Sequence, residues 1–183
     1  MGLTFGNDLG GVLIGIFLFI IGYACRFRKK QRSLYKWAVL LLLCIYIAMV
    51  IGVTLTPIPL DVSTAQNMVR IYQNMQYYNL IPFNEVFQHP DQFILNIILF
   101  VPFGILWTLY HDRMSFKRTL CAGFVFSLLI EVAQLGLSFL FHGPAWYFDV
   151  NDLIANTLGA MIGYLMVKLL VIPLFSLVRK QRT

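Results

Sequence analysis

Charged side chains are scarce in this chain. They make up 12% of its 183 residues, whereas hydrophobic side chains make up 59%. Soluble domains carry about 25% charged residues, so the scarcity excludes an ordinary soluble domain. The composition predicts an integral membrane protein with an all-α fold, because helices satisfy their own backbone groups in lipid.

Cysteine and histidine are also rare, with three of each. Cys25, Cys44 and Cys121 stand far apart in or beside apolar runs, so they predict neither a disulfide framework nor a metal site. The histidines are predicted in loops on different sides of the membrane, and we assign no metal ligand. The chain lacks a Ser-His nucleophile elbow and a phosphate-cradling loop, so no motif names a reaction or a cofactor.

Five apolar runs are long enough to cross a bilayer at about 1.5 Å per residue. The first has its basic residues behind it, which indicates a retained helix rather than a cleaved signal peptide. We divide the chain into a first helix with a basic loop (1–36), a membrane domain (37–175) and a basic tail (176–183). The five predicted spans are 9–25, 37–56, 93–110, 119–141 and 152–175.

Basic residues gather on one side of these spans. Twelve of the fourteen fall in the loops 26–36 and 111–118 and in the tail. Because cytoplasmic loops carry an excess of Lys and Arg, the N-terminus is predicted outside and the C-terminus inside. This placement accounts for the net charge of +6 without a nucleic-acid partner, and we predict none.

The long connection 57–92 falls on the predicted outer side. Its stretch from Ser63 to Gln66 has the pattern of a capping box. Positions 68, 71, 72, 75 and 78 then carry apolar or aromatic residues at helical spacing. These features predict a short helix lying on the membrane surface, and the alternative is a mobile loop.

Two polar or small stripes mark the last two spans. Glu131 lies in an apolar run, where a carboxyl needs a partner or a function. Helix geometry puts Glu131 near the bilayer centre, closest in depth to Gly159, with Asn156 or Gln134 as its hydrogen-bond donor. Each stripe lies on one helical face; the first is Ser127, Glu131, Gln134 and Ser138, and the second is Asp149, Asp152, Asn156, Gly159 and Gly163.

Four motifs in this chain together resemble the VanZ-like family. They are NLIPF at 79–83, NIILFVPFG at 96–104, EVAQ at 131–134 and FDVNDLIANTLG at 148–159. The resemblance covers roughly 43–168. It implies a small multi-pass protein of the bacterial cytoplasmic membrane, associated with resistance to teicoplanin-type lipoglycopeptide antibiotics. No settled biochemical activity comes with it.

The resemblance selects the same polar residues as the stripes, with two departures from the family pattern. Trp146 stands where the family commonly has an arginine, and Asn151 where it often has an aspartate. A tryptophan cannot bind an anion as arginine does, although it suits headgroup level or a sugar face. Carried over by position, the family's polar set is Asn96, Glu131, Gln134, Asp149, Asp152 and Asn156.

Two functions follow as hypotheses. In the first, the protein binds a lipid-linked cell-wall precursor, or the lipid of the antibiotic, in an outward-facing polar cleft between spans three, four and five. There the ligand-binding candidates are Asn96, Gln134, Trp146 and Asn156. In the second, it is an intramembrane enzyme that modifies a lipid or lipid-linked glycan, with Glu131, Asp149 and Asp152 as acid and base or as ligands of a hard cation.

Structural roles stay open beside both functions. Glu131 is equally well explained as a hydrogen-bonding group that joins helices. Asp149 is expected to cap the last helix, and Gly159 and Gly163 are expected to allow close helix packing. The sequence leaves the ligand, any cofactor and the oligomeric state open.

Overall fold

The computed structural model describes residues 4–5, 34–55, 58–59, 66–67, 70, 76–84, 86–87, 89–111, 115–141 and 146–174. The predicted span 9–25, the tail 176–183 and most of the predicted surface helix lie outside these residues. From the surface helix, Gln66, Asn67 and Arg70 are described as helical, whereas Tyr78 at its predicted end belongs to a strand.

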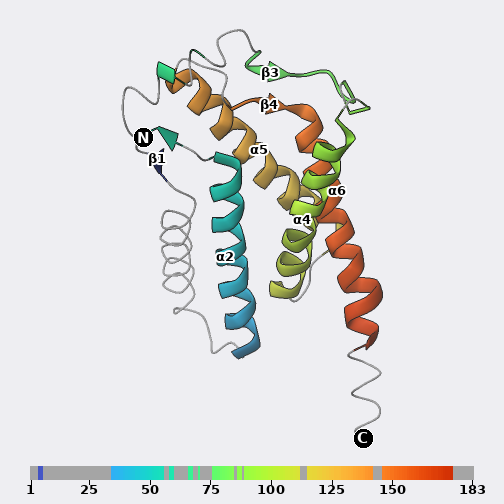
Figure 1. Cartoon of the computed structure of the whole chain (residues 1–183). Coiled ribbons are helices and arrows are strands. Elements are labelled where there is room, and N and C mark those ends of the chain that lie inside the picture. The colour runs from blue at the N-terminus through green and yellow to red at the C-terminus, as the bar shows by residue number, and fades with distance from the viewer. Residues whose placement is uncertain are drawn as a thin grey trace, which may run out of the picture.

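Four of the described helices are long and apolar enough to cross a membrane, and they match four of the five predicted spans to within three residues. The chain is therefore a multi-pass membrane protein. The last of these helices passes into a π-helix, η1 (Val167–Val171), and ends at Leu174. The four helices are α2 (Leu34–Leu55), α4 (Pro90–Tyr110), α5 (Phe116–Leu140) and α6 (Val150–Met166) (Figure 1).

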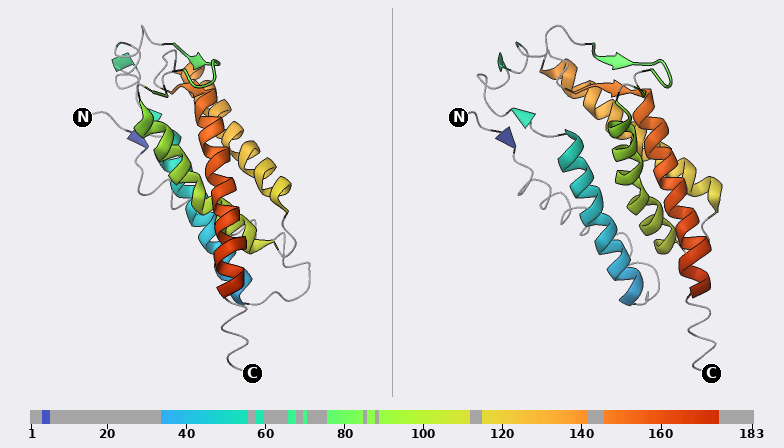
Figure 2. Two further views of the ribbon diagram at one scale, coloured as in Figure 1. Left: turned by 90° about the vertical axis from the view of Figure 1, so that its right-hand side faces the viewer. Right: turned by 45° about the vertical axis from the view of Figure 1, so that its right-hand side comes forward.

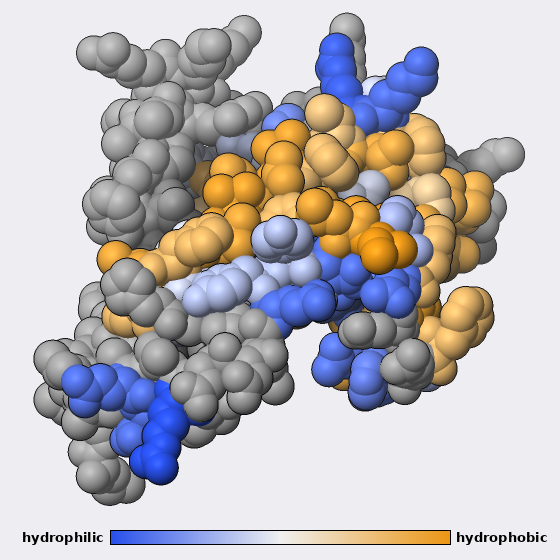
Figure 3. Space-filling model, turned by 90° about the horizontal axis from the view of Figure 1, so that it is seen from above, coloured by the Kyte–Doolittle hydropathy of each residue, from blue (hydrophilic) through white to orange (hydrophobic). Residues whose placement is uncertain are grey.

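Helix α6 packs on both α4 and α5, while α2 packs mainly on α4. Helices α4 and α6 pack against each other and run in the same direction, and α5 runs in the opposite direction at a slant to them (Figure 2). Seen from the end that carries β3 and β4, the described surface shows polar residues gathered between apolar ones (Figure 3).

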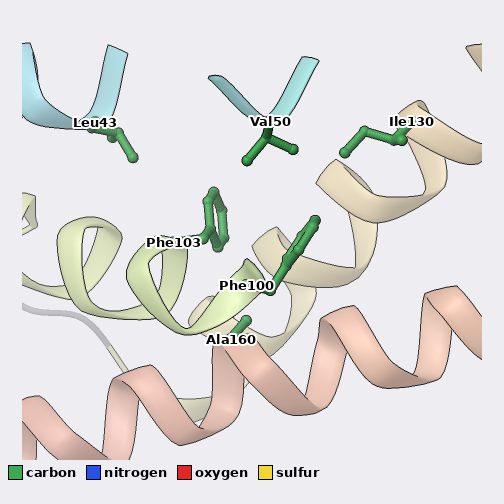
Figure 4. Close-up of a cluster of buried hydrophobic side chains, with 6 residues drawn as sticks. All are labelled: Leu43, Val50, Phe100, Phe103, Ile130 and Ala160. Carbon is green, nitrogen blue, oxygen red and sulfur yellow. The ribbon is translucent and has the colours of Figure 1, made fainter. Parts of the chain in front are cut away.

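Apolar side chains fill the space between the four helices. The rings of Phe100 and Phe103 of α4 pack against the ring of Phe126 of α5, at centroid distances of 5.4 and 5.2 Å. Aromatic pairs at such distances add to the stability that burial provides. The interior is thus packed where the rings of α4 and α5 meet. The buried cluster comprises Leu43, Val50, Phe100, Phe103, Ile130 and Ala160 (Figure 4).

Glycines bring α4 and α6 into backbone contact. A Cβ atom on Gly159 would collide with the carbonyl oxygen of Ile97, and one on Gly163 with that of Val101. The close-packing role predicted for these glycines is confirmed. Their partner is α4, however, and not the α5 helix whose polar stripe they were expected to face.

Two short strand pairs complete the fold. Strand β1 (Thr4–Phe5) pairs antiparallel with β2 (Ile58–Pro59). Strand β3 (Tyr78–Asn79) pairs in parallel with β4 (Phe148–Asp149), the two residues that lead directly into α6. The second pair brings the NLIPF motif onto the beginning of α6.

Candidate functional site

The chain turns back along α5 before α6 begins. The Ser138 hydroxyl donates to the carbonyl of Trp146 and accepts from its N–H. The backbone N–H of Asp149 then donates to Oε2 of Glu131 at 2.8 Å. Seven residues of helix separate Ser138 from Glu131, about 10.5 Å, and three extended residues cover about 10 Å. Helix α6 therefore begins two turns below Ser138, beside Glu131.

This returning segment changes the predicted depth of Glu131. The prediction assumed that α6 begins where α5 ends, which set Glu131 below Asp149 and level with Gly159. In the structure Glu131 lies at the same level as Asp149, and its side chain is 1% exposed. The predicted level of Glu131 relative to α6 was wrong. The hydrogen-bond donor to Glu131 is the Asp149 backbone, and not Asn156 or Gln134.

Below Glu131, α5 and α6 contact each other at intervals of four residues. Asn156 Nδ2 donates to the hydroxyl of Ser127 at 2.9 Å. One turn further on, a Cβ atom on Gly123 would meet that of Ala160. The predicted facing of the two stripes therefore holds at Asn156, whereas Asp152, Gly159 and Gly163 of the second stripe contact α4. Asn156 Oδ1 is buried and has no hydrogen-bond partner among the described residues.

The two aspartates at the start of α6 have different roles. Asp149 is the N-cap residue, and its Oδ1 accepts the N–H of Asn151 at 2.8 Å, which confirms its predicted capping role. Capping satisfies one of the N–H groups that a helix end leaves without a partner. Asp152 Oδ1 accepts from Asn96 Nδ2 at 2.5 Å and so joins α6 to α4.

A segment that we call the strap, Tyr77 to Asn84, lies across this helix start. Asn79 Nδ2 donates to Asp149 Oδ1 at 3.2 Å. Asn151 accepts from Phe83 N at 2.6 Å through Oδ1 and donates to Asn84 O at 3.0 Å through Nδ2. Asn79 and Asn151 are 5% and 4% exposed, so these contacts are buried. The strap is held to α6 by both asparagines.

A polar pocket opens between the strap, the start of α4 and the start of α6. Among the residues predicted for the site, only Asp149 and Asp152 line it. Asn96 and Glu131 lie behind them, each bonded to one of the two aspartates. The pocket combines carboxyl, amide and imidazole groups with the apolar side chains of Val86 and Phe93. Its full lining is Asn84, Val86, His89, Gln92, Phe93, Asp149, Asn151 and Asp152.

Gln134 and Trp146 contact the end of α2 and do not line this pocket. Gln134 Nε2 donates to Thr54 O at 3.0 Å, and the indole N–H of Trp146 donates to Leu55 O at 3.1 Å. The last carbonyls of a helix lack partners within it, and these two side chains supply them. Trp146 is 5% exposed, so its ring offers no open face to a sugar.

The structure adds pocket residues that sequence reasoning had left out. Asn84 and His89 carry no periodic signal, because the segment before α4 is not helical, and Gln92 lies in the first turn of α4, one turn before Asn96. Asn79 and Asn151 stand inside recognised motifs, and their positions beside a turn and a helix start were the available clue. Within the described residues, no three Cys, His, Asp or Glu side chains gather as ligands for a metal ion.

Comparison with known proteins identifies the family. The VanZ/LLP1 family model matches residues 38–171, which include nearly all of α2 and all of α4, α5 and α6. This chain belongs to the VanZ/LLP1 family. Protein VanZ of Enterococcus faecium is 28% identical over 122 residues, which are 67% of this chain and 68% of that protein. No solved structure matches the chain. The family membership predicted from the four motifs is confirmed.

Proposed function

We propose that this VanZ/LLP1 protein contributes to resistance to teicoplanin-type antibiotics by binding an amphiphilic molecule at the polar pocket. The ligand is the headgroup of a lipid-linked cell-wall precursor or the lipid-bearing antibiotic itself. Family membership supports the resistance role. The pocket supports binding, because its polar groups converge at one end of a membrane bundle next to apolar walls.

The observation that carries this proposal is that the pocket lies where three segments that carry family motifs meet. The strap supplies Asn84, α6 supplies Asp149 and Asp152, and Asn96 of α4 holds Asp152 in place. Small-ligand sites are lined mostly by apolar residues with a few polar groups in fixed positions. Here six of the eight lining residues are polar, which suits the polar head of a ligand. A molecule with a polar head and an apolar chain matches both parts.

We further propose that the pocket end faces outward across the bacterial cytoplasmic membrane. All four described acidic residues, Asp91, Glu131, Asp149 and Asp152, belong to this end of the bundle. Lys36, Lys117, Arg118 and Lys168 lie toward the other end, as expected for a cytoplasmic side. An outward pocket gives direct access to envelope precursors and to extracellular drugs.

The test is drug resistance in a teicoplanin-sensitive host that expresses the chain. Asp152→Asn keeps the size of the side chain and removes its negative charge, and we expect the rise in inhibitory concentration to be lost while membrane expression stays normal. Asp91→Asn is the matched control, because Asp91 lies exposed in the first turn of α4 and does not line the pocket. A glycopeptide without a lipid chain serves as the control drug. Full resistance in Asp152→Asn cells would contradict the proposal.

An enzymatic role is the second candidate, and the grouping of three carboxyls favours it. Glu131 Oε2 contacts the backbone of Asp149, and Asp152 begins the same helix. Neighbouring carboxyls in different surroundings can divide acid and base roles. Lipid mass spectrometry of expressing cells separates the two functions. A chemically altered lipid that disappears in Glu131→Gln cells supports the enzyme, whereas an unaltered lipid that co-purifies with the protein supports binding.

A further inference from the structure

The strap holds its backbone in one conformation. Besides the bonds to Asn79 and Asn151, the Tyr77 carbonyl accepts from Phe148 N at 3.1 Å, and the Tyr77 ring stacks on Phe139 of α5 at 5.3 Å. Phe83 has a φ of 61°, in the left-handed region that residues other than glycine seldom adopt. Such a conformation persists where surrounding contacts enforce it. The outward direction of the strap's side chains is therefore imposed by the fold.

Most of the large side chains that point outward here are apolar. Leu80, Ile81 and Phe83 are 61%, 64% and 57% exposed, and Phe87, just beyond the strap, is 92% exposed. Residues 76–84 include no charged residue. Single exposed apolar residues are ordinary, but a contiguous group on a fixed segment marks an interaction surface. Something apolar is expected to cover this group.

Lipid is the cover that the surroundings of the strap indicate. The strap is anchored through Tyr77 to Phe139, and Phe139 and Leu140 at the end of α5 are 58% and 68% exposed on a membrane-spanning helix. The lipid-facing surface of α5 therefore continues into the strap. Tyrosines such as Tyr77 and Tyr78 are characteristic of the zone between lipid headgroups and hydrocarbon.

We propose that the strap is an interfacial membrane anchor, in which Leu80, Ile81, Phe83 and Phe87 insert among lipids at the headgroup boundary. Because Asn79 and Asn151 tie the strap to α6, the anchor fixes the pocket at headgroup level. This inference goes beyond the proposed function, since it concerns the seat of the pocket in the bilayer and not its ligand.

Spin-label accessibility in the full-length protein tests the anchor. Single cysteines at Ile81 and Phe87, in a background whose three native cysteines are replaced, are labelled in vesicles of three parts phosphatidylcholine to one part phosphatidylglycerol. For each label, we compare its collision rate with oxygen to its collision rate with a water-soluble nickel chelate. The ratio of oxygen to chelate collisions at Ile81 and at Phe87 is expected to be at least threefold higher than the ratio at Asn67. Asn67 is a described, exposed polar residue outside the strap, and Ile98 on the exposed face of α4 is the hydrocarbon reference.

Two results would overturn the anchor. Labels at Ile81 and Phe87 that meet the nickel chelate as freely as the label at Asn67 would place the strap in water. Immobile labels that meet neither reagent would mean that protein covers it. Leu80→Cys replaces Ile81→Cys if the latter misfolds. A further check is Phe87→Asp, which should raise chelate access at Ile81 at least twofold, whereas Gln76→Asp should leave it unchanged.

Discussion

Helix α6 contacts its two neighbours through different chemistry. Against α4, the glycines Gly159 and Gly163 meet backbone carbonyl groups directly, and the Asn96–Asp152 hydrogen bond is added at the start of the helix. Against α5, Asn156 meets Ser127, and the backbone of Asp149 meets Glu131. Backbone cannot move aside for an added atom, whereas side chains can change rotamer or partner. The α4 contact thus fixes where α6 lies, and the α5 contact provides polar groups that substitution can alter one at a time.

The largest effect is expected from filling a glycine at the α4 contact. Gly159→Leu drives a side chain into the carbonyl of Ile97, and the expected loss of stability is about 3 kcal/mol or more, at the upper end for overpacking. Gly136→Leu is the control, because a Cβ atom on exposed Gly136 has no neighbour within 4 Å; its expected effect is within about 0.5 kcal/mol. Unfolding of the detergent-solubilised protein, followed by tryptophan fluorescence, measures both. A Gly159→Leu protein as stable as Gly136→Leu would show that the α4 contact is not rigid.

The next largest effect is expected at Glu131. Glu131→Leu leaves the N–H of Asp149 buried without an acceptor, which costs about 1–3 kcal/mol. Glu131→Gln keeps a carbonyl oxygen in the same place, and we expect stability close to that of the wild type. The same unfolding experiment compares the two variants. Equal stability for Leu and Gln would mean that the hydrogen bond to Asp149 contributes nothing, and normal resistance in the Gln variant would restrict Glu131 to a structural role.

The strap contact at the head of α6 is expected to be weaker. Asn151→Ala removes bonds to Phe83 N and Asn84 O, for a local loss of about 1–2 kcal/mol at about 1 kcal/mol per bond. Asn151→Asp keeps the acceptor for Phe83 and loses only the donor to Asn84. Hydrogen exchange of strap amides should therefore speed up most in Asn151→Ala and less in Asn151→Asp. An unchanged exchange rate in Asn151→Ala would show that Asn151 does not hold the strap to α6.

The smallest effect is expected within the α5 contact, between Ser127 and Asn156. A double-mutant cycle to alanine should give a coupling free energy of about 0.6 kcal/mol, the average for polar contacts between membrane helices. The buried pair Thr108 and Thr119 is the reference, since its oxygens lie 3.5 Å apart and should couple more weakly. A coupling of zero for Ser127 and Asn156 would mean that their side-chain contact does not help to hold α6 to α5.

The spans were predictable because hydropathy determines them. Runs of about 20 apolar residues located α2, α4, α5 and α6 to within three residues. The burial of Ser127, Glu131 and Ser138 on one face of α5 followed from helical spacing alone. The cap at Asp149 followed from its residue type and its place before a helix.

The level at which α6 begins was not predictable from periodicity. The returning segment after Trp146 is extended. Two hydrogen bonds join Trp146 to Ser138 and one joins Asp149 to Glu131, and none of them leaves a period in the sequence. The contacts of Gln134 and Trp146 were not predictable for a related reason. Both satisfy carbonyls at the end of α2, about 80 and 91 residues away in the chain, which are visible only after folding.

The hydrogen bonds between the strap and α6 have a consequence for synthesis. They join residues 67, 68 and 70 positions apart in sequence, and every one of them needs the start of α6. Since chains fold from the N-terminus as they are made, α2, α4 and α5 can be in the membrane while the strap still lacks its hydrogen bonds to α6. The pocket is completed only when the last described helix inserts. In a chain interrupted before Asp149, the apolar strap is not bonded to α6 and the carboxyl of Glu131 lacks its backbone N–H donor. Quality-control proteases are expected to degrade this incomplete form first.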